Sequence, residues 1–167
     1  MSWRDLSTPG YLVLFTTLVF WVVLRWFRGN IVLFWILASP GVILHELAHW
    51  MVAFVTLGRP GFIQLWPRRM GSAWSLGRVP IHNPAWYNAA FIGLAPLLLI
   101  PLAYFVFRYG TPAALHWTNA WRVPVTAFLA AECLLECVPS WPDLRMASKQ
   151  LIPGLILGAI AYFVWRK

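Results

Sequence analysis

The chain has 167 residues, of which 60% are hydrophobic and only 11% are charged. Ordinary soluble domains carry about 25% charged residues, so this composition excludes a soluble globular protein and favours a single membrane domain over residues 1–167. The formal charge of +8 does not indicate nucleic-acid binding. The basic residues flank apolar runs, as Arg25, Arg28 and Arg166 do, and such side chains reach toward lipid phosphates.

Five apolar segments predict about five transmembrane helices, at about 9–27, 31–57, 84–107, 121–139 and 150–166. The first four have the roughly 20 residues that a spanning helix needs, and the fifth is short but can still span. The first segment is followed by Arg25 and Trp26 with no small-residue cleavage site. We therefore interpret it as a retained helix and not as a signal peptide.

The second segment contains the sequence His45-Glu46-Leu47-Ala48-His49. Histidines four residues apart share a helix face and can bind one zinc ion, while the glutamate between them can act as a general base on zinc-activated water. Ionisable groups at membrane depth are costly unless they are paired or metal-bound. We therefore expect a hydrolytic zinc site. The alternative is a pair of histidines satisfied by neighbouring polar groups, with Glu46 paired to an arginine. Pro40 predicts a kink just before the motif.

The long connection after the second segment predicts a β-hairpin at about 60–82. Residues 62–66 and 73–76 are strand-like, residues 68–72 between them favour a turn, and residues 78–81 extend the second strand. An isolated hairpin is only marginally stable. We therefore expect it to pack on the helices or to enter the membrane interface.

Three of the five carboxylates lie in the fourth segment or just after it, at Glu132, Glu136 and Asp143. Two prolines should end that helix close to Asp143. Cys133 and Cys137 share a helix face, so a disulfide between them is geometrically poor. We interpret both cysteines as small buried residues, with metal binding as the less favoured alternative.

A catalytic zinc usually has three protein ligands and an open position, so a third ligand must join the two histidines. The options are Asp143, Glu136, Glu132, His82 and His116. The second and fourth helices run in the same direction, which brings their C-terminal ends to similar depth and makes Asp143 and Glu136 both feasible. His82 follows the hairpin on the correct side but near the surface, whereas His116 falls on the opposite face.

These elements resemble the site-2 protease family of intramembrane zinc metalloproteases. The likeness rests on the HELAH helix, the hairpin after it and Pro139-Ser140-Trp141-Pro142-Asp143, with Gly93-Leu94-Ala95-Pro96 weakly similar to a Gly-Pro signature of the third core helix. It covers about residues 31–145, the three-helix catalytic core. The resemblance implies that Asp143 is the third ligand. The family often has an asparagine where this chain has Glu136, which we interpret as a substrate-binding residue or an alternative ligand, and a glycine where it has Leu144.

The resemblance implies an endopeptidase that cleaves membrane-anchored proteins with Zn²⁺ and with Glu46 as the general base. The hairpin edge would hold an unwound substrate by strand addition. We expect an all-α, multi-pass protein of the cell membrane, with its active site nearer the cytoplasmic face; the charge distribution itself barely decides the orientation. The alternative function is a non-proteolytic membrane zinc-binding or interaction protein. The sequence identifies no regulatory partner or oligomer.

Overall fold

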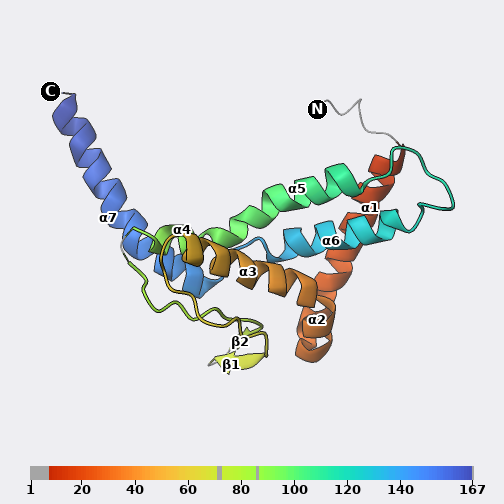
Figure 1. Cartoon of the computed structure of the whole chain (residues 1–167), viewed down its shortest axis with the longest axis horizontal. Helices are drawn as coiled ribbons and strands as arrows, with labels where there is room; N and C mark the ends of the chain where they lie inside the picture. Colours follow the sequence, from red (N-terminus) through yellow and green to blue (C-terminus); the bar gives the residue numbers. More distant parts are fainter. Residues whose placement is uncertain (1–7, 71–72, 86, 167) are drawn as a thin grey trace.

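The computed structural model describes residues 8–70, 73–85 and 87–166. This part of the chain is mostly helical with one small two-stranded sheet, as the sequence predicts. Figure 1 shows the helices and strands along the chain. They are α1 (Thr8–Trp26), η2 (Phe27–Gly29), α2 (Ile31–Leu37), α3 (Ser39–Val55), β1 (Arg68–Met70), β2 (Ala73–Ser75), α4 (Ala89–Gly93), η3 (Ala95–Leu98), α5 (Leu99–Gly110), α6 (Arg122–Glu136) and α7 (Trp141–Trp165).

Helix α6 lies at the centre of the helical body, with α1, α3 and α5 packed against it (Figure 1). Small side chains make this packing close. Ala127 and Ala131 are fully buried, and Cys133 is buried in the cluster that also holds Ala48 and Leu99. Small residues let helix backbones approach one another. Both cysteines are free thiols, as expected from their spacing.

The second apolar segment is broken into α2 and α3, which meet at a bend of 72°. Ala38 ends α2, and Pro40 stands in the first turn of α3. Proline is tolerated there because the first amides of a helix have no helical acceptor, whereas inside a continuous helix it removes a hydrogen bond and clashes. The kink predicted from Pro40 is therefore confirmed.

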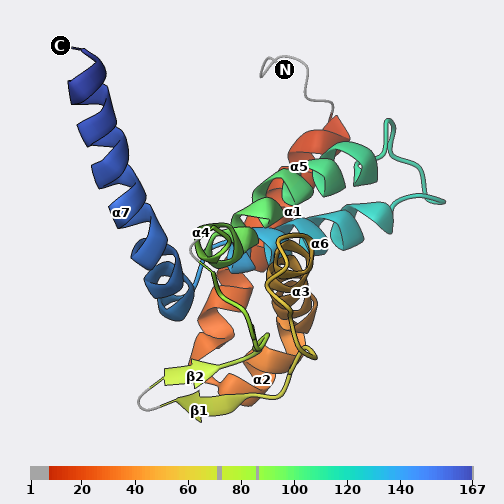
Figure 2. The same ribbon diagram turned by 60° about the vertical axis from the view of Figure 1, so that its left-hand side comes forward.

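The third and fifth predicted helices differ from the structure in their limits. The segment predicted at 84–107 becomes α4, the 3₁₀ turn η3 that contains Pro96, and α5, which continues to Gly110. The segment predicted at 150–166 begins much earlier, at Trp141, as α7. The reason is a capping box formed by Ser140 and Asp143, which starts a helix directly after the end of α6. The first part of α7 packs on α4, and its far end projects from the body (Figure 2).

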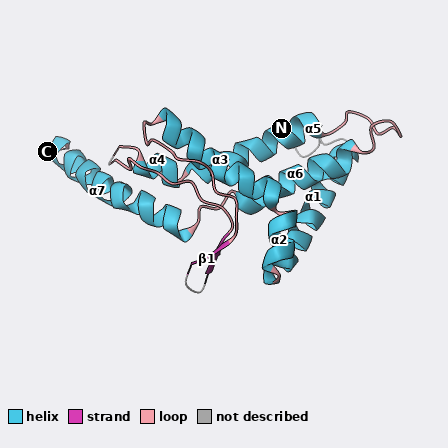
Figure 3. Cartoon of the chain, turned by 60° about the horizontal axis from the view of Figure 1, so that its bottom comes forward, coloured by secondary structure: helices cyan, strands magenta, loops and turns pink. Residues whose placement is uncertain are grey.

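The hairpin exists, but its predicted strand limits are wrong. Arg68, expected in the turn, pairs with Ser75 in the antiparallel β1–β2 ladder, and the connection at 71–72 lies outside the described residues. Residues 62–66 form no regular strand and contribute only the isolated bridge between Gln64 and Arg78. Pro60 and Pro67 on this arm have no amide hydrogen, so a continuous ladder cannot form. The hairpin hangs below the helices in Figure 3.

One segment of the described chain, Thr8–Gly29, is long and apolar enough to cross a membrane by itself. Two bent helix pairs pass the same criterion together: α2 with α3, and α6 with the first part of α7, which is bent by 53°. Length and composition thus support one span, or up to three if each bent pair counts as one.

Candidate metal centre

The two histidines of the HELAH motif lie on the inner face of α3. His45, Glu46 and His49 are 8%, 7% and 5% exposed. The ring atoms His45 Nε2 and His49 Nε2 are 3.2 Å apart. This close approach follows from the helix, because residues four apart lie one turn above each other on the same side.

Both imidazole rings are oriented by backbone carbonyls. His45 donates its Nδ1–H to the carbonyl oxygen of Glu136 at 2.7 Å, and His49 donates its Nδ1–H to the carbonyl oxygen of Ile92 at 2.7 Å. A carbonyl only accepts, so each hydrogen bond places the ring proton on Nδ1. In the neutral rings both Nε2 atoms then carry lone pairs, and these lone pairs face one another. Such outer hydrogen bonds are the usual way in which proteins orient metal-binding histidines.

Asp143 reaches the same point from the first turn of α7. Its Oδ2 lies 3.6 Å from His45 Nε2, and its Oδ1 lies 3.3 Å from His49 Nε2. Oδ2 also accepts hydrogen bonds from the amide and the hydroxyl of Ser140. The residue that caps α7 therefore also faces both histidines, and the capping bonds hold its carboxylate in place.

The donor set fits a metal ion. Nitrogen and oxygen ligands at tetrahedral positions about 2.0–2.1 Å from one zinc are separated by about 3.3 Å. The observed separations of 3.2, 3.3 and 3.6 Å match this value. Two imidazole lone pairs and a carboxylate all accept, so a cation is needed to satisfy them together. His45, His49 and Asp143 could thus hold a metal ion.

Two glycines allow the surrounding segments to come this close. A Cβ on Gly77, in the second hairpin arm, would lie 2.6 Å from Glu46 Cγ. A Cβ on Gly93, at the end of α4, would lie 2.5 Å from the carbonyl oxygen of Asp143. Neither contact leaves room for a side chain. The sequence shows both glycines, but only the tertiary structure reveals which side chains they accommodate.

A cavity of about 840 Å³ opens beside the histidines and the carboxylate. One wall is the second hairpin arm, including Trp74 and Arg78, and the opposite wall is the start of α7, including Trp141 and Met146. Glu46 lines the same cavity. The space therefore combines the metal-binding group, a carboxylate suited to proton transfer and mostly apolar walls, as small-molecule and peptide sites usually do.

The other candidate ligands lie elsewhere. Glu132 is fully buried and accepts a hydrogen bond from the Gly41 amide at 2.9 Å. Glu136 contributes its backbone carbonyl to His45 instead of its side chain. His82 donates its Nδ1–H to the carbonyl of Arg59 at the surface, and His116 lies in the exposed loop between α5 and α6. Sequence reasoning missed the parts played by Ile92 and Glu136, because backbone carbonyls leave no trace in residue identity.

The fold and the site define a small helical protein with one helix able to span a membrane and a buried His-His-Asp group able to hold a metal. Comparisons of the chain with protein-family models, with curated proteins and with solved structures found no match.

Proposed function

We propose that this protein is an intramembrane zinc metalloprotease that hydrolyses peptide bonds of membrane-anchored substrates. The observation that carries the proposal is the convergence of His45, His49 and Asp143 on one point, with Glu46 beside them in the same cavity. Two nitrogen ligands and one carboxylate with an open position are typical of catalytic zinc sites. The likeness of HELAH and of the Pro139–Asp143 motif to site-2 proteases supports the same activity.

Each residue then has a defined task. His45, His49 and Asp143 would hold Zn²⁺, which when bound lowers the pKa of water toward about 7 and polarises a carbonyl. Glu46 follows His45 directly and is buried against Gly77, so its carboxylate is held in place. It would accept a proton from the attacking water and deliver that proton to the leaving amine.

The substrate would lie between the hairpin and α7. Arg78 donates its amide to the carbonyl of Gln64 at 2.9–2.8 Å in both directions of the bridge, so the second hairpin arm is held at the cavity wall. A spanning helix hides its carbonyls and must unwind before hydrolysis. Strand addition along this arm would satisfy the backbone of an unwound segment, and the apolar walls suit the side chains of a membrane-spanning sequence.

The helices would sit in the bilayer as about five spans. Large apolar side chains point outward from α1, α3 and α5, including Phe15, Phe54 and Phe105, which are 67%, 62% and 51% exposed. Lipid is the medium that covers such surfaces at least cost. We place the protein in the cell membrane with the hairpin and the metal centre nearer the cytoplasmic face.

The test is purification in detergent, followed by elemental metal analysis and a cleavage assay on transmembrane peptides with and without a chelator. The protein should hold about one zinc per chain. Glu46→Gln should keep the zinc and lose cleavage, whereas His49→Ala and Asp143→Ala should lose the zinc. His116→Ala, a histidine outside the group, is the matched control and should lose neither. Cleavage that survives Glu46→Gln would refute the proposed mechanism.

A non-proteolytic zinc-binding or interaction protein is the second candidate. It is favoured by the same buried ligand set, because metal binding alone needs the two histidines and Asp143 but not Glu46. In that case zinc would bind stoichiometrically, transmembrane peptides would stay intact, and Glu46→Gln would alter no measured property of the metal centre.

A further inference from the structure

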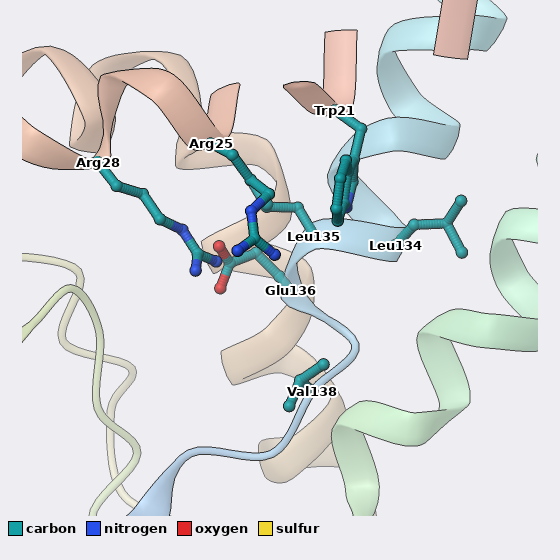
Figure 4. Close-up of a pocket in the computed structure, with 7 residues that line it drawn as sticks. All are labelled: Trp21, Arg25, Arg28, Leu134, Leu135, Glu136 and Val138. Carbon is teal, nitrogen blue, oxygen red and sulfur yellow. The ribbon is translucent and has the colours of Figure 1, made fainter. Parts of the chain in front are cut away.

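Glu136 lies in the wall between two cavities. It lines the large cavity at the metal centre and also a second cavity of about 380 Å³, which is bounded by Trp21, Arg25 and Arg28. Figure 4 shows its side chain leaving the end of α6 toward the guanidinium groups of Arg25 and Arg28. The backbone of Glu136 faces the metal centre, and its carboxylate faces the end of α1.

The backbone of Glu136 supplies the acceptor for His45. Its carbonyl belongs to the last turn of α6 and receives the Nδ1–H of His45 at 2.7 Å. The final carbonyls of a helix have no helical donor, so nothing within α6 fixes this group. The direction of the carbonyl therefore depends on how the side chain of the same residue is held.

The carboxylate of Glu136 is held from the side of α1. Arg28 interacts electrostatically with this carboxylate, and Arg28 is itself positioned over the Phe34 ring at 5.5 Å. Arg25 is positioned over the Trp21 ring at 4.8 Å. Glu136 Oε1 is buried without a hydrogen-bond partner within the described chain. A buried carboxylate with an unpaired oxygen is costly and calls for a compensating charge, which the two arginines supply.

We propose that Glu136 is a positioning residue for the metal centre: its carboxylate, held by Arg28 and Arg25, aligns its carbonyl so that His45 presents Nε2 to the metal. This role differs from both earlier interpretations of Glu136, as a substrate-binding residue or as a direct ligand. It also gives α1, which lies outside the three-helix core, a part in the site. The proposal rests on the proposed metal centre for its functional meaning, but its structural claim can be tested without metal.

The experiment measures the ring tautomers of the histidines by NMR in metal-free protein labelled with ¹⁵N-histidine, in detergent. In the native chain both His45 and His49 should be protonated at Nδ1. In Arg28→Ala and Glu136→Gln the His45 ring should shift to a mixture of tautomers. The His49 ring should not change, because its acceptor is the carbonyl of Ile92, and this constancy also shows that the variants are folded.

Two further variants complete the design. Arg28→Lys keeps the positive charge and should restore the native His45 tautomer. Arg108→Ala removes an arginine that lies over the Tyr109 ring at 5.9 Å, far from α6's end, and is the matched control. Outer-sphere substitutions commonly weaken metal binding about 10- to 100-fold, so Arg28→Ala should show a zinc affinity lower by that factor, with Arg108→Ala unchanged.

The outcomes separate this inference from the proposed function. If His45 keeps its native tautomer in both Arg28→Ala and Glu136→Gln, the positioning role is wrong. If His45 and His49 change together, the variants act by general loosening and the role is equally wrong. If the native protein binds no zinc while the tautomer of His45 still depends on Arg28, the proposed function fails and the positioning inference stands.

Discussion

Substitution of Gly93 by alanine tests how the fold positions Asp143. The added Cβ would lie 2.5 Å from the carbonyl oxygen of Asp143, whereas ordinary van der Waals contact begins at 3.4 Å. The start of α7 would therefore have to move by about 0.9 Å, the difference between these two distances. Metal–ligand distances tolerate only about 0.2 Å, so a shift of this size exceeds what the site can absorb.

The same substitution has two opposed effects on stability. Alanine is preferred over glycine within a helix by about 1 kcal/mol, while overpacking at a tight contact costs about 1–3 kcal/mol. Because the clash involves a backbone atom and the Ala147 Cβ at 3.0 Å, it cannot be relieved by turning a flexible side chain. We expect a net loss of stability of about 1 kcal/mol and a zinc affinity at least about 10-fold lower, by analogy with outer-sphere substitutions.

The assay is zinc titration with a competing chelator, together with thermal unfolding in the same detergent. Gly29→Ala is the matched control, since a Cβ on Gly29 would meet nothing within 4 Å. It should leave zinc affinity and the unfolding temperature as they are. If Gly93→Ala binds zinc as tightly as the native chain, the close approach of α4 and α7 does not position Asp143, and the reasoning from this contact is wrong.

Three further predictions follow from the same site. Gly77→Ala would place a Cβ 2.6 Å from Glu46 Cγ and should abolish cleavage while zinc stays bound; metal analysis beside the peptide assay checks this, and loss of both would contradict it. Ser140→Ala removes a cap of α7 and should lower the unfolding free energy by about 1 kcal/mol, measured by denaturant titration, with stoichiometric zinc retained. Chelation should lower the unfolding temperature, because a ligand at 100 times its Kd stabilises by about 2.7 kcal/mol; an Asp143→Ala protein should not respond to the chelator.

Several elements of the fold could be predicted because their causes are local. Pro40 breaks the second segment whatever surrounds it, since proline lacks the amide hydrogen that a helix interior requires. The end of α6 before Pro139 has the same cause. The early start of α7 was missed, although Ser140 and Asp143 have the spacing of a capping box, because the apolar pattern begins only later in the chain.

The hairpin shows where local reasoning fails. Its presence was predicted from strand-like residues around a turn, but the strands begin at Arg68 and Ala73. Register in a short hairpin depends on which residues find partners. Here prolines interrupt the first arm, and Trp35 donates its indole N–H to the carbonyl of Leu65 at 2.8 Å, which ties that arm to α2. This contact links residues far apart in the sequence and cannot be read from either segment alone.

By itself, the sequence determined that His45 and His49 share one helix face with Glu46 between them, because helical periodicity alone dictates that arrangement. It left Asp143 and Glu136 open as partners, since both follow from the same helix end. Only the tertiary structure decided between their side chains: the turn at Ser140 directs the carboxylate of Asp143 toward the histidines, while the side chain of Glu136 leaves toward Arg28. The physical reason is that chain direction after a helix end, and the backbone carbonyls that orient each ring, are set by packing between distant segments.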